Sequence, residues 1–161
     1  MIDYENIRKV VCKGLKDYIQ RPVIRQNQVA EIPEYPYVSY TITTLASENK
    51  GTYGQYDGGI QAKPLTQIWS ITAQSDNDIE CMSLISKCRE WLDNVGTIYL
   101  NDNNVVVRWV GNITNRDNIL TTDYEYRKGF DVTFAIADVV ESKIETIENV
   151  EMNINGEQGG E

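Results

Sequence analysis

The sequence predicts a single α+β domain, in which two amphipathic helices pack on a mostly antiparallel sheet of about four main strands. Segments whose apolar residues recur every three or four positions predict the helices. Segments rich in β-branched and aromatic residues, with alternating polarity, predict the strands. At 161 residues the chain is long enough for one domain with a substantial core. We place this domain at residues 1–141 and an acidic C-terminal tail at residues 142–161.

The two helices follow from apolar stripes and start signals. The first is expected over residues 4–19 with Asp3 as its N-cap. Gly14 lies inside it and suggests a close crossing over a strand. The second begins within residues 75–78, where Asn77 with Glu80 and Ser75 with Asp78 both have capping-box spacing, and runs to about Asn94. The residues expected to face the core are Tyr4, Ile7, Val11, Leu15 and Tyr18 in the first helix, and Cys81, Leu84, Ile85, Cys88, Leu92 and Val95 in the second.

Main strands are expected at residues 37–46, 65–74, 105–114 and 122–140, with short strands at residues 23–27 and 98–100. The last main strand would be about 60 Å long if straight. A small domain does not usually pair a strand of that length, so a bend or bulge is expected at Gly129. The core beneath the helices is predicted to contain Trp69, Ile71, Trp109, Phe130, Val132 and Phe134.

A long hairpin arm, residues 47–64, separates the first two main strands. A tight hairpin needs only about two to five residues, and longer loops commonly carry function. The arm's glycines give it flexibility, and its two tyrosines are of the type enriched at protein interfaces. We therefore expect the arm to contact another subunit or partner through Lys50, Tyr53, Gln55, Tyr56 and Asp57.

Composition argues against several function classes. A net charge of −9 does not suit a protein that wraps nucleic acid by neutralising phosphates. It suits a surface along which DNA slides, although solubility alone is the simpler explanation. The chain has no histidine, the commonest general base and metal ligand. No apolar run reaches membrane-spanning length, so no membrane contact is expected. The three cysteines, an odd number in helical patterns, are expected to be buried free thiols: Cys12, Cys81 and Cys88.

Three constellations resemble functional sites without completing one. The glycines of the arm lack the Gly-Lys-Ser/Thr and following helix of a phosphate loop. Asp76, Asp78 and Asp102 fit a helix cap and a turn better than a calcium loop. The aromatic residues of the strands lack the cations of a platform for single-stranded nucleic acid. The sequence therefore predicts no catalytic residue, no cofactor and no metal ligand.

The tail is acidic, since residues 143–161 contain five glutamates and one lysine. Its few apolar residues are too sparse for a second domain. A strand-like alternation nevertheless persists in Val150, Met152 and Ile154. We expect these three residues to form an interface by becoming ordered on an adjacent subunit or on a sheet edge.

The order of these elements resembles the phage tail terminator and neck terminator proteins. The resemblance covers about residues 1–141: an N-terminal helix, a strand pair with a glycine-rich arm, a second helix, and strands that end in Gly-Phe-Asp-Val-Thr-Phe-Ala-Ile at residues 129–136. It implies a structural protein of the virion, or of a headless tail-like particle, assembled in the bacterial cytoplasm. The implied assembly is a homohexameric ring, or collar, at the head-proximal end of the tail tube.

The resemblance also implies the partners of such a ring. They are the tail tube protein, the sheath protein if the tail is contractile, and a neck or head-completion protein. DNA would pass through the lumen without specific binding. Alternatives are another head–tail connector, a head-completion protein or a minor tube protein. A monomeric module that binds peptides at its sheet edge is a further alternative. A small enzyme is disfavoured because no nucleophile and base have suitable spacing.

Overall fold

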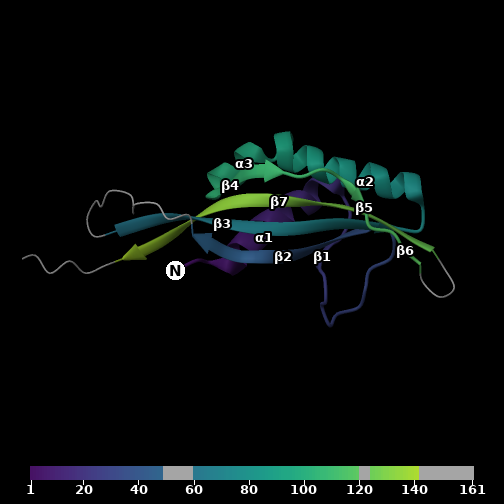
Figure 1. The fold of residues 1–161 in the computed structure, drawn as a ribbon, viewed down its shortest axis with the longest axis horizontal. Helices are drawn as coiled ribbons and strands as arrows, with labels where there is room; N and C mark the ends of the chain where they lie inside the picture. The colour runs from purple at the N-terminus through teal and green to yellow at the C-terminus, as the bar shows by residue number, and fades with distance from the viewer. Residues whose placement is uncertain (49–59, 120–123, 142–161) are drawn as a thin grey trace, which may run out of the picture.

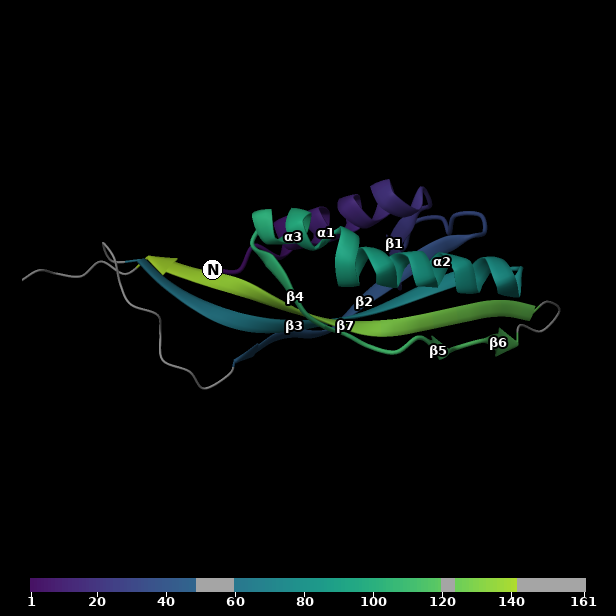
Figure 2. The ribbon, with the colours of Figure 1, turned by 90° about the horizontal axis from the view of Figure 1, so that it is seen from above.

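The computed structural model describes residues 1–48, 60–119 and 124–141. In this part of the chain one mixed sheet carries all of the helices on a single face (Figures 1 and 2). The strand order is β1-β2-β3-β7-β4, in which β1 is parallel to β2 and the other neighbours are antiparallel. The strands are β1 (Val23–Arg25), β2 (Tyr37–Glu48), β3 (Ile60–Ser75), β4 (Val105–Val110) and β7 (Tyr124–Glu141), with β5 (Thr114–Asn115) and β6 (Asn118–Ile119) paired to β7. The predicted α+β class is confirmed.

Helix α1 (Tyr4–Ile19) has the predicted bounds, and the Asp3 carboxylate accepts a hydrogen bond of 2.9 Å from the backbone N–H of Asn6. The residues of its buried face are Ile7, Val10, Val11, Leu15 and Ile19. Tyr4 and Tyr18 were wrongly expected in the core, because both lie at the margin of this face and are exposed. A Cβ on Gly14 would lie 2.6 Å from the ring of Tyr99, so this glycine crosses the later helical segments and not a strand.

Helix α2 (Asp78–Glu90) begins as predicted, with the side chain of Asn77 accepting a hydrogen bond from the N–H of Glu80. It continues into a π-helical turn, η1 (Trp91–Val95), in which Val95 is exposed and not buried as expected. Helix α3 (Thr97–Asp102) then occupies the position where a strand was predicted. A run of three apolar residues fits either structure. Packing decides for the helix, because only Leu100 of the three is buried in the core.

Strand β7 pairs with β3 from Tyr126 to Glu141 without a register shift, so the pairing has no bulge at Gly129, where a bend or bulge was predicted. Strand β3 begins at Ile60, five residues earlier than expected, and thereby supplies a partner for β7 from Tyr126 to its end. Gly129 is required for a different reason. A Cβ there would lie 2.6 Å from the guanidinium of Arg116, which crosses the sheet at this point.

The core lies between the sheet and the helices, and most of the predicted core residues are buried there: Trp69, Ile71, Phe130, Val132 and Phe134. Trp109 is the exception and is 58% exposed. Val107 pairs with Phe134 but Trp109 pairs with the next residue along, Thr133, so Arg108 is an extra residue in β4. A bulge of this kind interrupts the alternation and turns Trp109 to the uncovered face. Strand β4 also ends earlier than predicted, at Val110.

Candidate subunit and partner interfaces

A two-stranded ribbon projects from one end of the sheet (Figures 1 and 2). It consists of residues 60–64 of β3 paired with residues 137–141 of β7. The neighbouring strands stop short of it, since β2 ends opposite Leu65 and β4 begins opposite Ile136. Two-stranded ribbons are only marginally stable by themselves, and their open edges are templates for another strand. The ribbon is therefore the first candidate interface.

The second candidate is the sheet face opposite the helices, which has no covering layer around Trp109 in the described part of the chain (Figure 2). Continuous pairing of β3 with β7 and the bulge in β4 fix which side chains lie there. We call this surface the open face and define it by Ala62, Pro64, Thr66, Ile68, Val106, Trp109, Thr133, Ala135, Ala137 and Val139. None of these residues is charged, although 24% of the chain is.

Ionic contacts bound the open face at its far end. The Arg116 guanidinium donates hydrogen bonds to Ser70 Oγ at 2.7 Å and Thr72 Oγ1 at 2.9 Å, and pairs with Asp131 at 3.3 Å. Arg116 thereby holds the β5–β6 segment against the sheet and covers the backbone at Gly129. The open face is thus limited to the half of the sheet nearer the ribbon.

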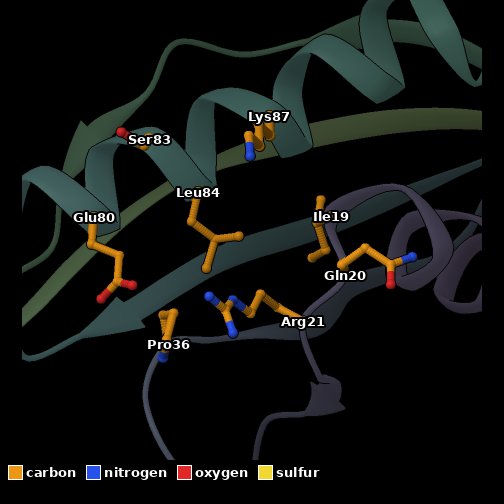
Figure 3. A pocket seen from close by; sticks show the side chains of 8 residues that line it. All are labelled: Ile19, Gln20, Arg21, Pro36, Glu80, Ser83, Leu84 and Lys87. Carbon is orange, nitrogen blue, oxygen red and sulfur yellow. The ribbon is translucent and has the colours of Figure 1, made fainter.

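The third candidate is a groove between the end of α1 and the first half of α2, with a volume of about 420 Å³ (Figure 3). We call it the α1–α2 groove. Its floor is apolar and its rim is charged: Ile19, Leu84 and Pro36 form the floor, and Arg21, Lys87 and Glu80 lie on the rim. The Glu80 carboxylate accepts a hydrogen bond of 2.9 Å from Ser75 Oγ. Neither Arg21 nor Lys87 forms an ion pair with any residue that the structure describes.

The candidate residues of the arm, Lys50, Tyr53, Gln55, Tyr56 and Asp57, lie outside the described residues, as do Val150, Met152 and Ile154 of the tail. The structure does place the ends of these segments. Strands β2 and β3 extend further than predicted, so that residues 49–59 and not 47–64 connect them. The ends of β2 and β7 and the start of β3 all lie at the ribbon end of the sheet (Figure 2).

Sequence reasoning did not find the α1–α2 groove or the open face. The groove joins residues that are distant in sequence, and no local pattern links Arg21 to Lys87. The open face had one available signal, the scarcity of charge at alternate positions of the strands. The bulge at Arg108 concealed its largest side chain, because an uninterrupted strand would have buried Trp109.

No chemistry is evident among the described cysteines and carboxylates. Burial raises the pKa of the Cys81 thiol to about 11 and that of Cys88 to about 12, so both remain protonated near neutral pH. Asp78 forms an ion pair with Lys128 at 3.0 Å. No group of three or more histidine, cysteine or acidic residues is placed to hold a metal ion within residues 1–48, 60–119 and 124–141. The helices of that part are too short or too polar to cross a membrane.

Comparison with protein families identifies a match. The sequence model of the phage neck terminator protein family matches residues 4–160, which includes most of the acidic tail as well as the folded domain. A search of curated proteins found no match. The family match covers nearly the whole chain, and the α+β fold agrees with the resemblance seen in the sequence. The protein thus belongs to the phage neck terminator family, whose members are structural proteins of the virion neck.

Proposed function

We propose that this protein is a tail terminator, or collar, subunit that forms a ring at the head-proximal end of the tail tube. Family membership supports the general role. The observation that carries the more specific role is the open face, because a monomer gains nothing from leaving half of a sheet uncharged and uncovered. Trp109, Val106 and Val139 are 58%, 43% and 46% exposed on it. Tryptophan is among the residues most often found at binding hot spots.

The contact made by the open face is with the next copy of the chain. The ribbon and the open face lie together on one side of the subunit, so a neighbour that covers one also meets the other. We propose that the open face meets a different surface of that copy, which makes the contact heterologous. A heterologous contact that closes on itself gives a ring and limits growth, as a terminator requires. We propose a homohexamer.

The partners of this ring would be the tail tube protein on one side and a neck or head-completion protein on the other, with the sheath protein added in a contractile tail. The arm, residues 49–59, and its tyrosines would contribute to these contacts. DNA would pass through the lumen without specific binding, consistent with a net charge of −9. The protein would act by assembly and not by catalysis.

The test compares two single variants of the full chain. Trp109→Glu places a charge at the centre of the open face, whereas Ile98→Glu changes an apolar residue that is 74% exposed on α3, away from that face. Light scattering of the wild type and of Ile98→Glu should give a hexamer mass. For Trp109→Glu we expect association at least about tenfold weaker, the effect of losing an interface hot spot.

Circular dichroism and the denaturant midpoint of each variant control for folding. Negative-stain images of the wild type should contain rings. A monomeric wild type without rings rejects the proposal. A Trp109→Glu variant that assembles as well as Ile98→Glu rejects the open face as the contact between subunits.

A further inference from the structure

We infer that the α1–α2 groove is the receptor for the acidic tail of a neighbouring copy of this chain. This inference rests on the proposed ring, because it needs a second copy beside the first. It assigns a binding site to a groove that the rest of the fold does not use. The occupant is the segment formed by residues 144–154.

The composition of the groove matches that segment. Ile19, Leu84 and Pro36 give an apolar floor, and Arg21 and Lys87 lie on opposite sides of it (Figure 3). In the tail, each of Ile144, Ile147 and Val150 is followed directly by a glutamate. The three apolar residues are three positions apart, so a segment in the polyproline II conformation, which has three residues per turn, can place them on the floor while its carboxylates meet the two cations.

Charge favours the binding of an acidic segment at this part of the surface. The chain has 15 cationic and 24 anionic residues, so an acidic segment is repelled by most of the molecule. The groove differs from that average surface, because Arg21 and Lys87 lie on either side of its apolar floor. Neither of them forms an ion pair with a described residue, so both can attract the carboxylates of the tail. Glu80 is the one acidic residue of the rim, and it already accepts a hydrogen bond from Ser75.

The position of the groove indicates that the tail comes from another copy. The end of α1 and the start of α2, which flank the groove, lie at the opposite end of the sheet from the end of β7 (Figures 1 and 2). Pro36, on the groove floor, directly precedes Tyr37. Gln74 of β3 pairs with Tyr37 on one side and with Arg127 on the other, so Pro36 lies close to the level of Arg127 along β7. From Arg127 to Glu141 the strand covers about 46 Å.

A tail that doubled back along its own strand would fall short of the groove. Even at the maximum extension of about 3.6 Å per residue, the chain from Glu141 spans only about 32 Å to Val150, and it comes level with the groove, at about 47 Å, only at Ile154. The apolar residues assigned to the floor, Ile144, Ile147 and Val150, therefore do not reach the groove of their own subunit. In a ring built by repetition of one contact, the ribbon end of one subunit can instead deliver the tail to the groove of the next.

Cross-linking of the full chain tests this inference. Ser83→Cys places a thiol beside the groove, and Met152→Cys places one in the tail. Under mild oxidation the double variant should give a ladder of covalently joined chains on a denaturing gel, since each subunit carries both thiols. Ser86→Cys with Met152→Cys is the matched control, because Ser86 is also an exposed serine of α2 but does not line this groove.

Charge reversal supplies a second measurement. In the cross-linking background, Arg21→Glu with Lys87→Glu should slow the reaction by about tenfold, because like charges then face each other. Adding Glu148→Lys and Glu151→Lys should restore the rate. Restoration would not follow if the first pair of substitutions had merely disturbed the fold.

Light scattering of the reduced protein separates the two proposals. An oligomer without the ladder overturns the tail site and leaves the ring intact. Cross-linking within single chains overturns the assignment to a neighbouring copy. A monomer without the ladder overturns both proposals. An oligomer with the ladder, slowed and restored by the charge reversals, establishes the site.

Discussion

Lys128 and Asp117 form an ion pair of 2.7 Å whose side chains are only 9% and 12% exposed. The same Lys128 Nζ lies 3.0 Å from Asp78 Oδ1, at the start of α2, and 3.3 Å from Asn115 Oδ1 in β5. One ammonium group therefore joins β7, the start of a helix and the short strands at the edge of the sheet. The Asp117 carboxylate also accepts a hydrogen bond from the backbone N–H of Arg127.

This cluster predicts how stability depends on pH. Burial by itself would raise the pKa of Asp117, but the hydrogen bonds from Lys128 and Arg127 prevail and hold that pKa below its usual value. Its contribution is therefore present above the ordinary carboxyl range and is lost as the pH falls through the lowered pKa. The urea midpoint of the wild type should fall with acidification in that range. For Asp117→Asn this part of the pH dependence should be absent.

Lys128→Ala should lower the free energy of unfolding by about 3–5 kcal/mol, because it leaves the mostly buried Asp117 carboxylate without its cation. Urea denaturation at neutral pH measures this loss. Lys9→Ala is the control, since Lys9 forms an exposed pair with Glu5 in α1 and its loss should change stability by less than about 0.5 kcal/mol. Equal effects of the two substitutions would contradict the assigned role of Lys128.

Phe134→Ala should lower the free energy of unfolding by about 3–5 kcal/mol, the usual effect of a large cavity in a core. Phe134 is fully buried and packs edge-on against Trp69 with 5.6 Å between ring centroids. The denaturant midpoint and the near-ultraviolet circular dichroism of Trp69 report the loss. An unchanged midpoint would show that this part of the core is placed incorrectly.

Gly14→Ala decides between two opposite expectations. Helix propensity alone predicts a gain of about 1 kcal/mol, because alanine is the better residue inside a helix. Packing predicts a loss, since the new Cβ would lie 2.5 Å from the ring of Trp91, which is 4% exposed and has no room to move away. We expect packing to prevail, with a loss of about 1–3 kcal/mol. A higher thermal midpoint than the wild type would show that propensity prevails.

Structural features of this protein that depend on residues close together in the sequence could be predicted, whereas features that depend on contacts between distant elements could not. The two main helices, the capping by Asp3 and Asn77, and most of the core follow from local patterns, and these predictions were correct. The secondary structure of residues 98–100 and the exposure of Trp109 depend on contacts with distant elements. A short apolar run becomes helical because Leu100 reaches the core.

The ribbon and the α1–α2 groove also depend on contacts between elements that are distant in the sequence. The ribbon exists because β3 and β7 extend beyond their other neighbours, a property of pairing and not of either strand alone. The α1–α2 groove likewise needs α1 and α2 to pack beside each other. Local sequence did single out the arm and the tail, through glycine content, tyrosines and charge. Those segments remain predictions, because they lie outside the described residues.

Replacing both arm tyrosines, Tyr53→Ser with Tyr56→Ser, should leave the subunit folded and impair assembly. Each tyrosine would contribute about 1–3 kcal/mol if a neighbour buries it. Strands β2 and β3 hold the two ends of the segment at the projecting end of the sheet. We therefore predict that the double substitution does not affect the core. The denaturant midpoint of the variant should therefore equal that of the wild type.

Assembly is measured by complementing a phage that lacks the wild-type gene and counting complete tails in electron micrographs. The control is Tyr4→Ser, which removes a tyrosine that is 41% exposed on α1 at a site outside the proposed contacts. This control should restore complete tails, whereas the double variant should yield fewer of them or tails of irregular length, because a weakened terminator no longer stops tube growth. Complete tails in normal numbers from the double variant would exclude the arm tyrosines as interface anchors.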